Sequence, residues 1–148
     1  MRSRRALRTI RRVTITTVPP NGRSVRENRT DYRLLRRALL RDLSTGARSR
    51  GEVCDAHPEL VRAGLHIGVP RRETCPVCEA DTLRAVHYAF PSRGPHRRSG
   101  RALPQGVLAR HAERHGDLMV YVVEVCTGCA WHHLLESYRL LARGSAVG

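Results

Sequence analysis

The sequence contains no lysine, one tryptophan and one phenylalanine, and aromatic residues occupy only 4% of its 148 positions. Few large side chains are available to fill an extensive core, and the length fits one modest domain or two very small ones. No apolar run approaches the about 18 residues that a membrane-spanning helix needs. The basic N-terminus lacks the apolar segment and cleavage site of a secretory signal. We therefore expect a cytoplasmic protein with no membrane partner, in a compartment where thiols stay reduced.

Sequence motifs of common enzyme classes are also missing. The chain has no glycine-rich phosphate loop, no nucleophile elbow and no paired-carboxylate arrangement. Histidines away from the cysteines show no recognised metal-ligand spacing; these are His87, His96, His111 and His115. The sequence thus predicts a protein that is not an enzyme and has no evident small-molecule substrate.

Two Cys-x-x-Cys pairs are the most informative feature that is present, Cys75-Pro-Val-Cys78 and Cys126-Thr-Gly-Cys129. Together they supply four thiolates, enough to close a tetrahedral zinc shell. The second pair directly follows an apolar run at residues 118–125, which is the order of strand and knuckle in a zinc ribbon. A metal cross-link also suits a small, sparsely filled core. We predict zinc as the cofactor, with Cys75, Cys78, Cys126 and Cys129 as its ligands.

The interval between the two pairs is long. Residues 79–125 separate them, whereas compact sites use about 15–20 residues. Residues 91–116, rich in Arg, Gly, Pro and His, are the expected insertion. Two alternatives stay open: a ribbon that has kept its thiols without a metal, and a redox dithiol. A redox pair usually lies at a helix N-terminus, and the sequence around Cys75 does not suggest that context.

Positive charge is concentrated at the start of the chain. All 27 cationic residues are arginine, and residues 1–30 carry nine of them against one acid, Glu27. Blocks of like charge are usually disordered and often bind polyanions. We expect a basic disordered tail at 1–30, with Val18 and Val25 as alternative starts of the chain, and a short tail at 144–148. Nucleic-acid contacts are predicted in this tail and just beyond it, at Arg4, Arg5, Arg8, Arg11, Arg12, Arg33, Arg36 and Arg37.

Residues 31–70 are predicted to form a unit of three short helices. Apolar residues spaced three and four apart from Tyr32 to Leu43 predict the first helix, with Asp31 as N-cap and Gly46 after its end. Ser49 and Glu52 form a capping box for a second helix through Cys54. A third begins at Asp55 as N-cap, with a proline in its first turn. A helix-turn-helix function is not favoured, because the third helix presents too few long polar side chains to read bases.

Residues 71–143 are predicted to form a zinc-ribbon-like antiparallel sheet. Strands are expected at 82–90 and 117–125, the latter central because it is apolar on both faces. A helix is expected at 103–115, inside the insertion. The segment after Cys129 fits either a strand or a helix, and the strand is favoured. The predicted fold class is therefore α+β, a small N-terminal helical unit followed by a ribbon-like sheet with a long insertion between the knuckles.

Three further residues are candidates for the metal site. Cys54 lacks a partner cysteine nearby in the sequence, so packing is favoured over ligation. His132 and His133 follow the second pair and would point to opposite faces of a strand. Packing or surface roles are favoured for them, with hydrogen bonds to thiolates or direct ligation as alternatives.

Four segments carry a resemblance to a known family. They are the runs at 53–60 and 120–126, the first Cys-x-x-Cys pair, and Cys129-Ala-Trp-His-His-Leu134. Together they resemble a family of short, zinc-ribbon-like actinobacterial proteins described as a domain of unknown function, over residues 32–140. The resemblance implies an actinobacterial, cytoplasmic origin and four cysteine ligands, but no substrate. Ala130 stands where this family and zinc ribbons commonly have glycine, which eases a positive φ.

These observations lead to two expected functions. The first is a non-enzymatic structural-zinc module, an accessory factor of a nucleic-acid machine such as the ribosome or RNA polymerase, with RNA, DNA or a nucleoprotein as partner. The alternative is a protein-interaction or regulatory module without nucleic-acid contact, in which arginines meet an acidic protein partner.

Overall fold

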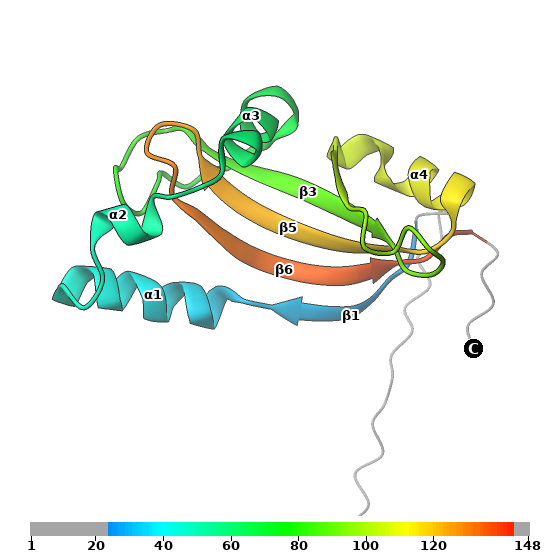
Figure 1. Ribbon diagram of the computed structural model, residues 1–148, viewed down its shortest axis with the longest axis horizontal. Coiled ribbons are helices and arrows are strands. Elements are labelled where there is room, and N and C mark those ends of the chain that lie inside the picture. Colours follow the sequence, from blue (N-terminus) through cyan, green and yellow to red (C-terminus); the bar gives the residue numbers. More distant parts are fainter. Residues whose placement is uncertain (1–23, 144–148) are drawn as a thin grey trace, which may run out of the picture.

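The computed structural model describes residues 24–143, so the five arginines predicted in the basic tail lie outside the described residues. The described chain contains four α-helices, one 3-10 helix and six strands (Figure 1). The helices are α1 (Arg33–Thr45), α2 (Arg50–Val53), α3 (Pro58–Ile67) and α4 (Leu108–His115). The strands are β1 (Arg26–Asp31), β2 (Val69–Pro70), β3 (Leu83–Pro91), β4 (Arg101–Leu103), β5 (Leu118–Cys126) and β6 (His132–Leu140). The predicted α+β class is confirmed.

All strand pairs are antiparallel, in the order β1-β6-β5-β3-β2, and β4 pairs with β3. The strand β5 lies between β6 and β3, as its continuous apolar sequence predicted. The strands β3 and β5 are in register along their whole length, from Leu83 opposite Cys126 to Pro91 opposite Leu118. The segment after Cys129 is a strand, the favoured of the two possibilities.

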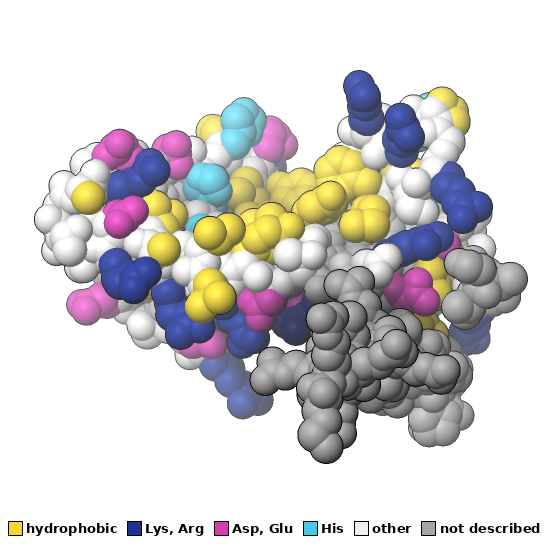
Figure 2. Space-filling view, turned by 90° about the horizontal axis from the view of Figure 1, so that it is seen from below, with side chains coloured by type: hydrophobic (Ala, Val, Ile, Leu, Met, Phe, Trp, Pro, Cys, Tyr) yellow, Lys and Arg dark blue, Asp and Glu magenta, His cyan; other side chains and the backbone are white. Residues whose placement is uncertain are grey.

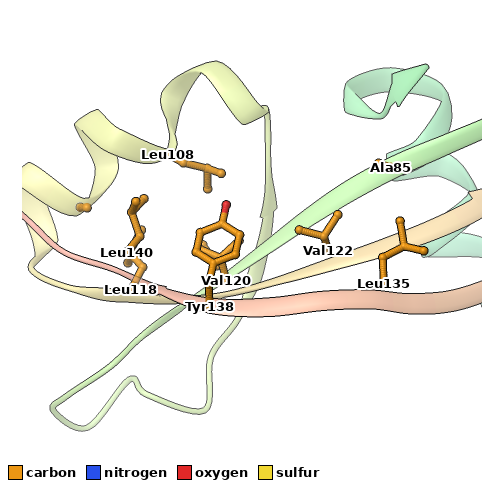
Figure 3. Close-up of a cluster of buried hydrophobic side chains, with 10 residues drawn as sticks. Ala85, Leu108, Leu118, Val120, Val122, Leu135, Tyr138 and Leu140 are labelled. Carbon is orange, nitrogen blue, oxygen red and sulfur yellow. The ribbon is translucent and has the colours of Figure 1, made fainter. Parts of the chain in front are cut away.

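One face of the sheet packs against α4 and forms the larger core. Figure 3 shows Leu108 of α4 facing Tyr138 and Leu140 of β6. Alternate residues of β3 and β5 complete this cluster, because neighbouring side chains of a strand point to opposite faces; they are Ala85, Ala89, Leu118, Val120 and Val122. This core packs α4 against the sheet and contains no cysteine.

A second, smaller core surrounds the cysteines. Trp131, Val53 and Leu83 are buried there together with Cys75 and Cys126. Three leucines of α1 pack against it, Leu39, Leu40 and Leu43. Helices α1 and α2 of the predicted three-helix unit thus share this core with the two Cys-x-x-Cys loops.

The helix boundaries differ from the sequence prediction at two N-caps. The N-cap of α1 is Tyr32, and Asp31 instead accepts a 2.9 Å hydrogen bond from the backbone N–H of Arg33. The N-cap of α3 is His57, whose Nδ1 accepts from the backbone N–H of Glu59 at 3.1 Å. Pro58 is the first residue of this helix, a position that proline favours, so the cap falls on the residue before it and not on Asp55. The predicted capping box of Ser49 and Glu52 is present at the start of α2. The helix α1 ends before Gly46, as predicted, and Gly46 has a φ of 80°.

Two other boundaries also move. The predicted tail extended to residue 30, but Arg26–Asp31 form β1 and pair with β6. Arg26 lies over the ring of Tyr138 at 4.4 Å, a cation–π contact that helps to hold this edge strand. The helix predicted at 103–115 begins only at Leu108, because Pro104 disfavours a helical conformation at the preceding Leu103, which belongs to β4.

Candidate metal centre

Both Cys-x-x-Cys loops lie in the turns of β-hairpins. The first loop connects β2 to β3, and the second connects β5 to β6. Because Leu83 at the start of β3 pairs with Cys126 at the end of β5, the two turns meet at the same end of the sheet. The antiparallel topology thus brings together two pairs that are 47 residues apart in the sequence.

The two loops have the same backbone geometry. The N–H of Glu79 donates to the carbonyl of Cys75 at 2.9 Å, and the N–H of Ala130 donates to the carbonyl of Cys126 at 3.0 Å. Glu79 and Ala130 both have a positive φ, 61° and 65°. A positive φ is therefore present at position 130, where the resembling family commonly has glycine. Ala130 adopts this φ at a steric cost.

The four cysteine sulfurs form one cluster. The Sγ atoms of the two pairs all lie within 4.8 Å of one another. The Sγ atoms of Cys75 and Cys129 are 3.6 Å apart, as are those of Cys78 and Cys126. A metal bound tetrahedrally by four thiolates at about 2.3 Å separates its sulfurs by about 3.8 Å. The cluster therefore has the size of a four-thiolate metal shell, and all four cysteines are free of disulfides.

Hydrogen bonds lower the pKa of one of these four thiols, that of Cys126. Burial raises the pKa of the Cys126 thiol, but hydrogen bonds from the Thr82 hydroxyl and from the backbone N–H groups of Cys129 and Gly128 outweigh it and lower the pKa to about 6. The Thr82 Oγ1 lies 3.0 Å from the Cys126 sulfur. Burial raises the pKa values of Cys75 and Cys129. Thr82 was not predicted from the sequence, because it lies seven residues after Cys75 and outside any motif.

Cys54 lies beside the cluster and outside its four-sulfur set. Its sulfur is 3.7 Å from that of Cys129, and its side chain packs against the smaller core. The sequence showed no partner for Cys54 because the neighbouring thiol is 75 residues away. The predicted packing role agrees with this position.

The two histidines after the second pair have partners other than sulfur. The Nε2 of His132 is 3.0 Å from a carboxylate oxygen of Asp55. The ring of His133 stacks on Trp131, with centroids 6.1 Å apart, and burial lowers its pKa. The four-sulfur set includes neither histidine.

The arginines predicted to bind nucleic acid differ in their surroundings. Arg33 forms an ion pair with Asp31, and Arg36 reaches the fully buried carboxylate of Glu124. Arg36 cannot meet a phosphate without giving up this ion pair, which would leave the buried Glu124 with only Arg71 and Trp131 as partners. Its predicted contact with nucleic acid stays a prediction. Arg37 is exposed, and within residues 24–143 it has no carboxylate partner.

The fold and the cluster together define a small α+β protein with a cysteine cluster that could hold a metal ion. The chain belongs to the family of unknown function DUF5318, which matches residues 23–147. It is similar to the uncharacterized proteins Mb0050 of Mycobacterium bovis and Rv0049 of Mycobacterium tuberculosis. Each is 42% identical over 112 residues, which cover 74% of this chain and 80% of the relative. No solved structure gives a significant match.

Proposed function

We propose that the protein is a structural-zinc module. The observation that carries this proposal is the spacing of the four sulfurs, 3.6 Å within the cross-loop pairs and 4.8 Å at most. Four thiolates in tetrahedral array are typical of zinc or of an iron–sulfur centre. Zinc is favoured because each Cys-x-x-Cys loop supplies two adjacent ligands from one tight turn, as in zinc ribbons.

The proposed zinc is structural, and the protein is not an enzyme. Four protein thiolates occupy every position of a tetrahedral zinc ion, so no position is left for an activated water. The cluster lies between α1, α2 and the sheet in the smaller core. Zinc there would hold the two hairpin turns together, and its binding energy would contribute to folding.

Elemental analysis and X-ray absorption test this proposal. Purified protein is expected to hold one zinc per chain, with about four sulfurs at about 2.3 Å from the metal. Cys126→Ser is expected to lose the zinc and much of the folded structure. A cooperatively folded wild type without metal, or a shell with nitrogen or water oxygen ligands, would contradict the proposal.

We further propose that this module binds nucleic acid in the cytoplasm, as an accessory factor of a machine such as the ribosome or RNA polymerase. The support is charge: the chain has 27 arginines and 13 acidic residues, a formal net charge of +14. Among the described residues no helix is long and apolar enough to cross a membrane. Binding of a labelled RNA at several salt concentrations tests this, and an affinity that does not depend on salt would contradict it.

A protein-interaction module is the second candidate. Two adjacent leucines of α1 favour it, because Leu34 is 73% exposed and Leu35 is 62% exposed. The sequence placed Leu35 on the buried face of this helix. Pull-down from native cytosol with and without nuclease separates the two functions: nuclease should remove the partners of a nucleic-acid module and leave those of a protein-interaction module.

A further inference from the structure

The face of the sheet opposite α4 carries a group of aromatic side chains. Because alternate residues share a face, the residues between those of the larger core point to this second face. They include Tyr88 and Phe90 of β3 and Met119, Tyr121 and Val123 of β5. All five are partly buried, so their side chains are neither sealed in a core nor fully in water. The chain has only six Phe, Trp and Tyr residues, and half of them lie here.

The strand register places the three rings together. Tyr88 lies directly opposite Tyr121, and Phe90 lies opposite Met119 on the same two strands. The rings of Phe90 and Tyr121 are 5.5 Å apart at an interplanar angle of 83°. This edge-to-face packing holds the rings on the rigid part of the sheet.

These rings form the floor of a groove with two adjoining parts. The larger part, of about 750 Å³, is lined by the three rings and by Val123 and Leu134. The smaller part, of about 560 Å³, shares Phe90 and Tyr121 with it and continues past Met119. Figure 2 shows hydrophobic side chains gathered in a hollow, with histidines at one side and arginines at the other. The shared residues make one continuous groove across the sheet.

The two ends of the groove differ in charge. Arg97 and Arg98 line the smaller part, and within residues 24–143 neither guanidinium has a carboxylate partner. At the other end the acids already have partners: Glu52 accepts from the backbone of Ser49 in the capping box, and Asp55 contacts His132. The groove therefore offers free positive charge at one end and little free negative charge at the other.

We propose that this groove binds single-stranded nucleic acid, with unpaired bases on the rings of Tyr88, Phe90 and Tyr121 and phosphates at Arg97 and Arg98. Aromatic rings on a sheet beside unpaired arginines are the combination that single strands use, since bases stack and phosphates pair with cations. A neutral apolar peptide would leave both guanidinium groups unpaired. This inference rests on the proposed nucleic-acid function and assigns it a surface distinct from the basic N-terminal segment.

Fluorescence anisotropy with a labelled 12-nucleotide oligouridine tests the stacking part. In the full-length protein, Tyr88→Leu with Tyr121→Leu keeps the groove apolar but removes two rings. Binding is expected to weaken about tenfold or more, since stacking is lost at two positions. Tyr88→Phe with Tyr121→Phe keeps the rings and is expected to retain binding. Circular dichroism and zinc content show whether each variant is folded.

A matched pair of arginine variants tests the phosphate part. Arg97→Ala with Arg98→Ala is expected to weaken binding and to lower the salt slope by about 1.4, since two phosphate contacts to a single strand are lost. Arg110→Ala with Arg114→Ala removes the same charge from exposed positions of α4, on the other side of the sheet, and is expected to leave affinity nearly unchanged.

The outcomes separate this inference from the proposed function. If wild type binds the oligonucleotide and the ring and Arg97/Arg98 variants bind equally well, the groove assignment is wrong and the nucleic-acid function stands. If wild type binds neither oligouridine nor a mixed-sequence RNA, the nucleic-acid function itself is wrong. If the leucine variant binds as wild type and only the Arg97/Arg98 variant binds more weakly, stacking is excluded and the proposal that bases lie on these rings is overturned.

Discussion

The indole Nε1 of Trp131 donates a 2.9 Å hydrogen bond to the carboxylate of Glu124, which is completely buried. The same oxygen accepts from the guanidinium of Arg36 in α1, and Arg71 lies 3.5 Å from the other oxygen as an ion pair. Trp131 follows the second Cys-x-x-Cys loop and belongs to the smaller core. One buried carboxylate on the central strand β5 thus links the helix α1 to the end of the sheet where the four cysteines cluster.

Arg36→Met is expected to destabilise the protein by about 3 kcal/mol, because it leaves the charge of Glu124 buried with a weaker set of partners. Urea unfolding of zinc-loaded protein measures this. Arg37→Met, at the exposed neighbouring position, is expected to change stability by less than about 0.5 kcal/mol. Equal effects of the two substitutions would show that Glu124 does not depend on Arg36.

Cys54→Ala is expected to keep the full zinc content and to cost about 1–2 kcal/mol from lost packing. Its sulfur lies beside Cys129 but outside the four-sulfur set. Cys75→Ala is the control and is expected to lose the metal. Elemental analysis after dialysis compares the two, and loss of zinc in Cys54→Ala would make Cys54 a ligand.

His87→Leu is expected to make stability less sensitive to acid. His87 is 5% exposed, its Nδ1 has no hydrogen-bond partner within residues 24–143, and burial lowers its pKa. As pH falls below about 6.5 the unfolded chain takes up a proton that the folded chain refuses, so wild type loses stability there. Between pH 7.5 and 5.5 the loss in His87→Leu is expected to be smaller by up to about 1.4 kcal/mol.

Urea unfolding at the two pH values measures this difference. Acid release of the proposed zinc would affect both proteins equally, so only the difference between them reports on His87. An identical loss in wild type and variant would mean that folding does not lower the pKa of His87.

Ala130→Gly is expected to raise the thermal midpoint by a few degrees, because Ala130 holds a φ of 65° that costs an L-residue about 1 kcal/mol. Gly46→Ala is the reverse experiment. Gly46 has φ 80° and open space around it, so an added methyl group would meet no other atom and only backbone strain is introduced. A lower midpoint for Gly46→Ala and a higher one for Ala130→Gly are expected from calorimetry.

Local patterns in the sequence predicted much of the fold and the cluster. The capping box of Ser49, the glycine end of α1 and the apolar run of β5 each depend on a few neighbouring residues. The four clustered cysteines followed from the chemistry of paired Cys-x-x-Cys loops. Such features can be read without knowing the partners of a strand.

Features that depend on register could not be predicted. The sequence placed Arg36 on a solvated helix face, because the buried Glu124 is 88 residues away. It placed residues 26–30 in a tail and Asp31 at a helix cap, because their polar sequence shows no strand pattern until β6 is available to pair with them. Tyr88 and Tyr121 become neighbours only through the pairing of β3 and β5.

That pairing also determines where the long insertion lies. The strands β3 and β5 each have nine residues, so their far ends, at Pro91 and Leu118, lie about 26 Å from the cysteine turns. The loop at 92–100, which lies at this far end and precedes β4, can therefore change in length without moving the cysteine turns. The number of residues between the two Cys-x-x-Cys pairs is therefore a poor guide to the geometry of the site.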